Sequence, residues 1–212
     1  MSIRELLYAE CPYKNYPIRD GSIDGWNSRH PKLGDLLRSI NPKLVLEIGS
    51  WKGASALFMS ENTDAHIICL DTFLGAAEMW TNHADPERYG ALRLENGFPT
   101  VIRDFMSNVI RAGKQDQITP MPMPSSIGLK LLFKWNMNPE LIYVDGSHDF
   151  DDVLSDIKLS MCLGPRILCG DDFGTWDGVT RAVQRWIPDA NKEHGGFWWL
   201  DMRNRMSSPA IE

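Results

Sequence analysis

The feature that most constrains the fold of this chain is a regular alternation of short apolar runs with longer helical segments. The runs cover residues 44–48, 66–70, 141–144 and 166–169, with a more polar candidate at 117–121. Runs of this length are typical of parallel strands buried on both faces. The alternation predicts an α/β fold with a Rossmann-like, doubly wound and mostly parallel sheet of seven strands. We expect residues 197–200 to add an antiparallel closing strand.

Helices are predicted between these strands, and two segments fall outside the pattern. The helical stretches span residues 32–40, 54–60, 99–112, 126–135, 150–162 and 178–186. Residues 1–31 form an irregular arm in this interpretation, rich in Pro, Gly, Asn and aromatic residues. Residues 72–98 show little periodicity, and we expect a lid or acceptor-binding segment there. No repeat or linker divides the chain, so we predict a single domain over residues 1–212.

The charge of the chain argues against some partners. It carries 22 Lys and Arg against 28 Asp and Glu, a formal net charge of -6, and the basic residues form no stripe. Because nucleic acids bind surfaces where Lys and Arg are clustered to neutralise the phosphates, we expect no nucleic-acid partner. No apolar run approaches the roughly 20 residues that span a bilayer, and the first residues lack the apolar core of a signal peptide. We therefore expect a cytoplasmic protein without a membrane partner.

A glycine-containing turn follows the first predicted strand and opens the next helix. Glu47, Gly49 and Gly53 form the pattern E-x-G-x-x-x-G. Glycine at position 49 permits a tight turn and close approach of a ligand, and the start of the helix offers free N–H groups. A dinucleotide fingerprint would require G-x-G-x-x-G, and Trp51 replaces its second glycine. Glu47 would repel phosphates and would attract a cationic ligand, directly or through water.

Asp71 follows the second predicted strand, where an acidic residue accepts hydrogen bonds from ribose hydroxyls in nucleotide-binding sheets. A positively charged sulfonium nucleoside with a free ribose suits Glu47 and Asp71 better than NADP does. We therefore predict S-adenosylmethionine as the cofactor. In the plainer interpretation, Gly49 and Gly53 only make a turn and Asp71 caps the next segment. The strand–turn–helix context disfavours it.

Three carboxylates follow two successive predicted strands, with a histidine close behind the first. Asp145 comes after the fourth strand, His148 lies three residues later, and Asp171 and Asp172 come after the fifth strand. Close carboxylates repel one another unless a cation lies among them, and oxygen ligands suit Mg²⁺, Mn²⁺ or Ca²⁺. His148 would then take a proton from a hydroxyl that the metal has acidified. The plainer alternatives are a turn with an Asx cap for the Asp pair and a helix-start residue for His148.

Four segments together resemble class I S-adenosylmethionine-dependent methyltransferases. They read VLEIGSWKGAS, ICLDTFLGAAEMW, LIYVDGSHDFDDVLSDI and ILCGDDFGTWDGVTRAV. More narrowly, residues 40–200 resemble the metal-dependent sugar and small-molecule O-methyltransferases grouped with macrocin O-methyltransferase. The pairing of D-G-x-H with D-D is the most specific part of this likeness.

The resemblance implies a set of site residues. The three carboxylates named above would be the metal ligands, and either His148 or Asp145 would act as the base. Ser125 or Ser126 would lie near the adenine, although the Pro-rich run before them departs from the usual pattern. The expected cofactor contacts are Glu47, Gly49, Ser50, Gly53, Ser55, Asp71, Thr72, Ser125, Ser126 and Asp145.

The acceptor is expected to be a small molecule or glycan that offers a hydroxyl or a diol. Candidates for binding it are residues on segments that would roof the site, namely Trp80, His83, Arg88, Tyr89 and Trp176. Each of them is also typical of lid packing. Two other classes stay open, a hydroxylase or NAD-type oxidoreductase on a similar fold and a non-catalytic module that binds the cofactor. The sequence also leaves open whether the chain forms a homodimer.

Overall fold

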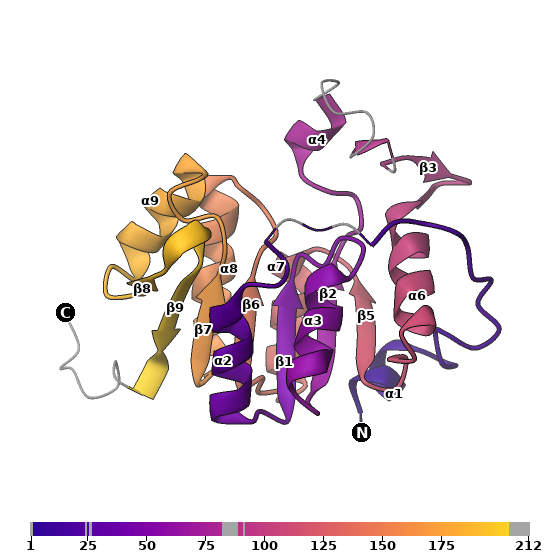
Figure 1. Cartoon of the computed structure of the whole chain (residues 1–212), viewed down its shortest axis with the longest axis horizontal. Helices are drawn as coiled ribbons and strands as arrows, with labels where there is room; N and C mark the ends of the chain where they lie inside the picture. The colour runs from indigo at the N-terminus through magenta and orange to yellow at the C-terminus, as the bar shows by residue number, and fades with distance from the viewer. Residues whose placement is uncertain (1, 24, 26, 82–88, 91, 204–212) are drawn as a thin grey trace.

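The computed structural model describes residues 2–23, 25, 27–81, 89–90 and 92–203 and is built on a seven-stranded sheet. The strand order is β5-β2-β1-β6-β7-β9-β8 (Figure 1). The strands from β5 to β7 are parallel, and β9 and β8 form antiparallel pairs at one edge. Their bounds are β1 Leu44–Ile48, β2 His66–Asp71, β5 Ile118–Pro122, β6 Leu141–Val144, β7 Ile167–Gly170, β8 Asn191–Lys192 and β9 Trp198–Asp201. The predicted doubly wound sheet with an antiparallel closing strand is confirmed.

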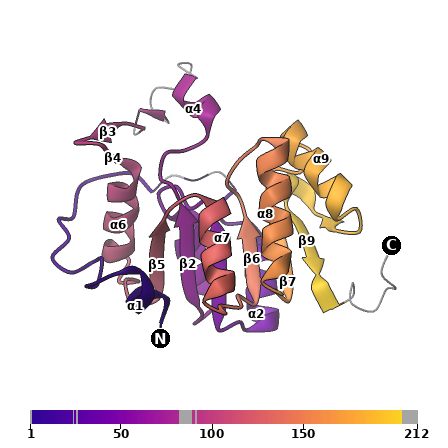
Figure 2. The same cartoon turned by 180° about the vertical axis from the view of Figure 1, so that it is seen from behind.

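Helices cover both faces of this sheet (Figures 1 and 2). One layer consists of α2 (Pro31–Ile40), α3 (Ala54–Asn62) and α6 (Val101–Arg111), and the other of α7 (Ser125–Lys134), α8 (Phe150–Cys162) and α9 (Asp177–Trp186). Alternate strand residues enter the two cores. In β2, Ile67 and Cys69 pack in one core, and Ile68 and Leu70 pack in the other. Burial on both faces explains why the strands appear as continuous apolar runs.

Short elements that the sequence analysis did not predict surround this core. α1 (Ile3–Leu7) begins with a capping box. β3 (Leu94–Glu95) and β4 (Phe98–Pro99) form a hairpin through Asn96 and Gly97, both with positive φ. Because the hairpin includes position 99, α6 begins two residues later than predicted. The remaining short elements are α4 (Ala77–Thr81) and a 3-10 helix at His194–Gly196.

The N-terminal arm is fixed near the carboxyl ends of the strands. The buried side chain of Asn108, on α6, donates hydrogen bonds to the carbonyl oxygens of Ser22 (3.1 Å) and Lys52 (3.0 Å). The ammonium group of Lys52 also donates to Ser22 Oγ (2.8 Å). Farther along the chain, Asn27 meets Asp171 at the rim of the sheet.

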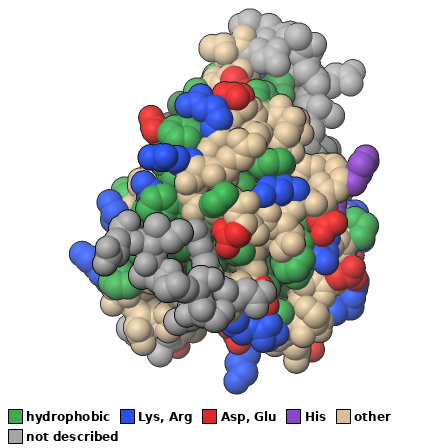
Figure 3. Space-filling view, turned by 90° about the vertical axis from the view of Figure 1, so that its left-hand side faces the viewer, with side chains coloured by type: hydrophobic (Ala, Val, Ile, Leu, Met, Phe, Trp, Pro, Cys, Tyr) green, Lys and Arg blue, Asp and Glu red, His purple; other side chains and the backbone are tan. Residues whose placement is uncertain are grey.

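The surface shows mixed charge on the face displayed in Figure 3. There, Lys and Arg side chains alternate with Asp and Glu and do not gather into one basic patch. Among the described residues, no helix is both long and apolar enough to cross a bilayer.

Candidate functional site

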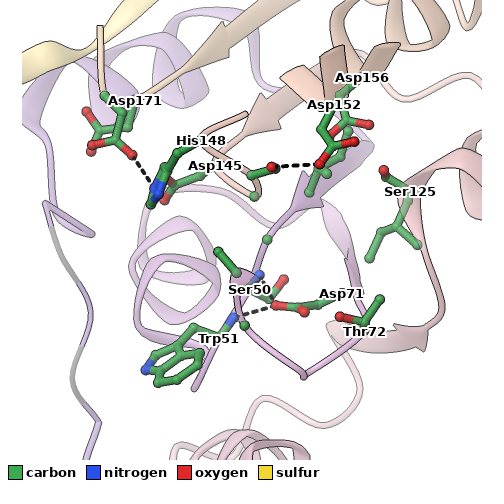
Figure 4. Close-up of a pocket in the computed structure, with 18 of the residues that line it drawn as sticks. Ser50, Trp51, Asp71, Thr72, Ser125, Asp145, His148, Asp152, Asp156 and Asp171 are labelled. Carbon is green, nitrogen blue, oxygen red and sulfur yellow. Dashed lines mark hydrogen bonds and ion pairs between the residues drawn. The ribbon is translucent and has the colours of Figure 1, made fainter. Parts of the chain in front are cut away.

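A cleft of about 760 Å³ opens at the carboxyl ends of the parallel strands. It includes the crevice between β1 and β6, where the strand order reverses and where doubly wound sheets bind ligands. Figure 4 shows the residues that converge there from the ends of separate strands. The predicted cofactor residues that line it are Gly49, Ser50, Ser55, Asp71, Thr72, Ser125, Ser126 and Asp145.

The turn after β1 has a backbone that requires glycine at its first position. Gly49 has a φ of +87°, and a Cβ placed on it would lie 2.1 Å from the carbonyl oxygen of Asp145. Trp51 and Gly53 also have positive φ, and Gly53 is the N-cap residue of α3. The turn therefore folds back directly onto the end of β6, with its backbone facing the cleft.

Asp71 holds this turn in place through its carboxylate. Its Oδ2 accepts hydrogen bonds from the backbone N–H groups of Ser50 (2.7 Å) and Trp51 (2.8 Å) (Figure 4). Its Oδ1 accepts one from the backbone N–H group of Phe73 (2.6 Å). Burial raises the pKa of Asp71 above its ordinary value, although the three N–H groups favour the ionised form. Asp71, which we predicted to accept hydrogen bonds from ribose hydroxyls, thus also holds the loop in place. Its contact with a ribose stays a prediction.

Glu47 lies beneath the turn and does not line the cleft. It is completely buried, and its Oε1 accepts a hydrogen bond from Ser55 Oγ (2.5 Å). Burial raises the pKa of Glu47 to about 7. Neither Glu47 nor Gly53 lines the cleft, since Glu47 bonds Ser55 of α3 and a Cβ on Gly53 would lie 3.1 Å from the Phe105 ring; their contact with a cofactor stays a prediction. We assign both to the support of the loop.

The three predicted metal carboxylates line the same cleft, and each has a partner of its own. Tyr143 OH donates to Asp145 Oδ2 (3.2 Å), and Asn27 Nδ2 donates to Asp171 Oδ1 (2.9 Å). Asp172 pairs with the imidazole described below. Burial, followed by the charges of Asp171 and Asp172, raises the pKa of Asp145 well above its ordinary value. Burial also raises the pKa of Asp171 to about 6.

These carboxylates fit a metal ion in their chemistry but not in their present orientation. Within the described part of the chain, no three Asp, Glu, His or Cys side chains form a group that could hold a metal ion. Carboxylate oxygens are ligands that Mg²⁺ and Ca²⁺ prefer, and a cation would offset the neighbouring charges that add to burial in raising the pKa of Asp145. Asp171 and Asp172 are instead bonded to Asn27 and His148. Metal binding stays a prediction.

His148 lies between two carboxylates and against an indole ring. Its Nδ1 is 2.5 Å from Glu78 Oε1, its Nε2 is 3.2 Å from Asp172 Oδ2, and its ring stacks on Trp176 with centroids 4.1 Å apart. Burial lowers the pKa of His148, but the hydrogen bonds to Asp172 and Glu78 outweigh burial and raise the pKa overall. An imidazolium bonded on both sides cannot accept a proton. His148 can therefore act as a base only when one of the two carboxylates leaves its ring nitrogen.

The wall of the cleft formed by α7 and α8 contains both predicted serines. Ser125 and Ser126, at the start of α7, line it together with Asp152 and Asp156 of α8. Ser147 Oγ donates to Asp152 Oδ2 (2.9 Å). Burial raises the pKa of Asp156 to about 6, partly offset by a hydrogen bond from Ser125. The two aspartates were not predicted, although their i, i+4 spacing places both on one face of a helix.

The predicted acceptor residues fall into three groups. Tyr89 and Trp176 line the cleft. Trp80 does not line it, because its indole N–H donates to a carbonyl oxygen of its own segment (2.7 Å). His83 and Arg88 lie outside the described residues.

Sequence analysis also missed two side chains that complete the acidic rim. Asn27, from the arm, donates to Asp171 and to the carbonyl oxygen of Gly195 (3.1 Å). Glu78, from α4, bonds His148. Asn27 and Asp171 are 144 positions apart, and Glu78 and His148 are 70 positions apart. No local pattern signals contacts over such separations.

Comparison with known proteins agrees with this architecture. Residues 46–163, more than half of the chain, match a family model described as a methyltransferase domain. No curated protein matches the sequence. Among solved structures, the calicheamicin methyltransferase CalS11 has a TM-score of 0.57 at 14% identity, over 80% of this chain and 76% of that one.

Two further structures have the same fold and contain a ligand. An O-methyltransferase from Bacillus cereus in complex with S-adenosylhomocysteine has a TM-score of 0.52 at 15% identity, over 88% of this chain and 82% of that one. The O-methyltransferase TomG from Streptomyces achromogenes, involved in tomaymycin synthesis and in complex with S-adenosylmethionine, has a TM-score of 0.50 at 12% identity. The matched region covers 92% of this chain and 90% of TomG.

Proposed function

Since the chain belongs to this methyltransferase-domain family, we propose that it is a metal-dependent O-methyltransferase that takes its methyl group from S-adenosylmethionine. The observation that carries the proposal is the meeting of the glycine turn and the three carboxylates in one cleft. Gly49 packs directly against the carbonyl oxygen of Asp145. A cofactor on the turn would therefore present its methyl group beside the acidic rim.

Charge and backbone geometry support S-adenosylmethionine as the methyl donor. The cofactor carries a positive sulfonium and no phosphate, and the cleft beside the turn is lined by the carboxylates of Asp71 and Asp145. The positive φ of Gly49 lets a ligand approach the backbone closely. The B. cereus and S. achromogenes enzymes bind S-adenosylhomocysteine and S-adenosylmethionine on the same fold.

Asp145, Asp171 and Asp172 would hold the metal ion. When bound, it would supply an electrophile that lowers the pKa of a coordinated acceptor hydroxyl. Asn27 and His148 each contact only one oxygen of Asp171 and Asp172, so the second oxygen of each carboxylate would be available to the metal ion. Movement of Asp172 away from His148 would in addition free Nε2 to accept a proton.

Methyl transfer would then be a displacement at the methyl carbon. The acceptor oxygen forms the new C–O bond as the C–S bond breaks, and the sulfonium becomes the neutral thioether of S-adenosylhomocysteine. The hydroxyl proton passes to Nε2 of His148. A positioned base contributes about 10²- to 10⁴-fold to a rate, and alignment of the oxygen with the C–S bond contributes the larger share.

The lining favours a neutral acceptor with several hydroxyls, such as a sugar. The carboxylates in the lining are Asp71, Asp145, Asp149, Asp152, Asp156, Asp171 and Asp172. No Lys or Arg of the described residues lines the cleft with them. A phosphorylated acceptor would be repelled by this charge. Tyr89 and Trp176 offer aromatic faces on which the apolar face of a sugar can stack.

The proposal is tested with methyl-labelled cofactor, a panel of sugar diols and catechols, and EDTA. We expect label to enter a sugar diol, EDTA to reduce transfer by about 100-fold or more, and added Mg²⁺ to restore it. Asp172→Asn should lose transfer, and Asp177→Asn, an exposed acid at the start of α9, should keep it. Transfer undiminished by EDTA would overturn the metal role. Calorimetry that shows NAD binding and no binding of S-adenosylhomocysteine would overturn the cofactor and favour an oxidoreductase.

A further inference from the structure

We propose that Glu78, on α4, is a positioning residue that fixes the imidazole of His148 with Nε2 directed at the reacting hydroxyl. The inference rests on the function proposed above and adds a residue that neither the family match nor the sequence motifs assign. It starts from the 2.5 Å contact between Glu78 Oε1 and His148 Nδ1. This contact joins α4 to the loop before α8, and Ala77 and Met79 of α4 line the cleft beside it.

The imidazole is held in its plane and at both nitrogens. Trp176, the N-cap residue of α9, stacks on the ring with 4° between the two planes. The stack restricts tilting of the ring and leaves both nitrogens accessible at its edge. Glu78 bonds one nitrogen and Asp172 the other, and the histidine side chain is only 17% exposed. The orientation of the ring is therefore set by Glu78 of α4 and by Asp172 and Trp176 of the segment between β7 and α9.

Only one of the two carboxylates can stay in place during the proposed reaction. A neutral imidazole has a single N–H, so it donates to one carboxylate and keeps a lone pair on its other nitrogen. Asp172 lines the cleft and Glu78 does not, so a base that acts on a hydroxyl in the cleft needs Asp172 to leave Nε2, whereas Glu78 can stay at Nδ1. With Glu78 retained at Nδ1, the proton stays on Nδ1 and the lone pair of Nε2 faces the cleft. Glu78 thereby selects the tautomer in which His148 can act as a base.

A purely structural role for Glu78 makes different predictions. An exposed ion pair stabilises a protein by little, and the Glu78 side chain is 41% exposed. If the contact only anchored α4, other changes on that helix would have similar effects. Thr81 provides the matched control, because its hydroxyl donates to the backbone carbonyl of Glu78 and its side chain is exposed.

The first test needs no acceptor and uses the ring N–H of His148 in the full chain with S-adenosylhomocysteine bound. In NMR spectra of ¹⁵N-labelled protein, we expect a protected Nδ1–H resonance that disappears in His148→Ala and in Glu78→Ala. Thr81→Ala should keep it. A resonance that persists in Glu78→Ala would overturn the positioning role. Its loss in Thr81→Ala as well would assign the contact to folding of α4.

The second test measures kcat and KM with the acceptor found for the proposed function. Glu78→Ala should lower kcat by about 10- to 100-fold and leave the Kd of S-adenosylhomocysteine within about threefold, because a base out of position loses much of its contribution. Glu78→Gln, whose amide oxygen still accepts the N–H, should recover most of this loss. In a His148→Ala background, Glu78→Ala should have no further effect on kcat.

The outcomes separate the two proposals. Full activity in His148→Ala would remove the proposed base and with it the role of Glu78. A large loss in His148→Ala with wild-type kcat in Glu78→Ala would overturn only the positioning role. Additive losses in the double variant would overturn it too, since they would show that Glu78 acts independently of His148.

Discussion

The two sides of the cleft are held together in different ways. On the cofactor side, the turn after β1 is fixed by backbone groups, with Asp71 bonding N–H groups 20 and 21 positions away. On the acceptor side, Asp171 and His148 depend on side chains 144 and 70 positions away. The glycine turn and its Asp71 clamp therefore lie within one strand–turn–helix–strand unit, whereas the partners of Asp171 and His148 come from distant segments.

The largest effect should come from removing the glycine on which the cofactor side depends. Gly49→Ala places a methyl group 2.1 Å from the carbonyl oxygen of Asp145, at a φ of +87°. Overpacking and backbone strain each contribute about 1–3 kcal/mol, so the free energy of unfolding should fall by about 4 kcal/mol. Urea denaturation measures this change.

Gly146→Ala is the matched control for this variant, in the same cleft. Its Cβ would have no neighbour nearer than Ile48 Cγ2 at 3.5 Å. We expect it to change the free energy of unfolding by less than about 1 kcal/mol. Equal losses in the two variants would show that the turn does not require glycine specifically at position 49.

A second prediction concerns the pH dependence of stability, which Glu47 should dominate on the cofactor side. Its pKa is raised from 4.5 to about 7, so the folded protein retains a proton that the unfolded chain releases as the pH rises. The free energy of unfolding should therefore decrease between pH 4.5 and pH 7. The contribution of this group is up to about 3 kcal/mol, at 1.36 kcal/mol per pKa unit. Glu47→Gln cannot ionise and should be the more stable protein at pH 8.

Denaturation of both proteins at several pH values gives this difference directly. Buried acids such as Asp156 and Asp171 affect wild type and variant alike, so the difference between the two curves is attributed to Glu47 and to its charge acting on Asp145. Glu61→Gln, at the exposed end of α3, serves as the control and should follow the wild-type curve. Parallel curves for wild type and Glu47→Gln would contradict the assignment.

The same division explains what the sequence could predict. The parallel strands appear as apolar runs because both of their faces are buried, and the key acids follow them directly. Asp71, Asp145, Asp171 and Asp172 could therefore be placed at one rim from the sequence alone. Their partners could not be placed, because the pairing of Asp171 with Asn27 depends on the path of an arm that has no periodicity.

The direction of the Glu47 side chain could not be predicted from the sequence either. Glu47 precedes the turn and carries a charge, features that suggested contact with a cationic ligand. Alternation along β1 instead directs it under α3, where it bonds Ser55 and has a raised pKa. The hairpin at residues 94–99 was not predicted for a different reason. Its Asn96–Gly97 turn is a strong local signal, but the two strands that it joins are only two residues long and show no alternating pattern.

A third prediction weakens the clamp on the turn without removing its side chain. In Asp71→Asn, the side chain keeps one acceptor oxygen and has an NH₂ group in place of the other. This NH₂ group would face at least one of the backbone N–H groups of Ser50, Trp51 and Phe73, which then loses its acceptor. Hydrogen bonds to a charged group contribute about 1.5–3 kcal/mol, and we expect a loss of about 2 kcal/mol in stability. Calorimetry should also show binding of S-adenosylhomocysteine weakened by about tenfold. Asp64→Asn, exposed before β2, should change neither quantity; an unaltered Kd in Asp71→Asn would show that the clamp does not shape the cofactor site.

The smallest predicted effect tests whether the acceptor side depends on the arm. Asn27→Gly removes the hydrogen bond to Asp171 and keeps the positive φ of 45° without strain. This part-buried hydrogen bond is worth about 1 kcal/mol, so kcat/KM for the acceptor should fall by about fivefold. The Kd of S-adenosylhomocysteine should stay within twofold. Asn15→Gly makes the same substitution at another exposed, positive-φ position of the arm and should leave both quantities unchanged. A loss of cofactor affinity in Asn27→Gly equal to its loss of turnover would show that the two sides of the cleft are not built independently.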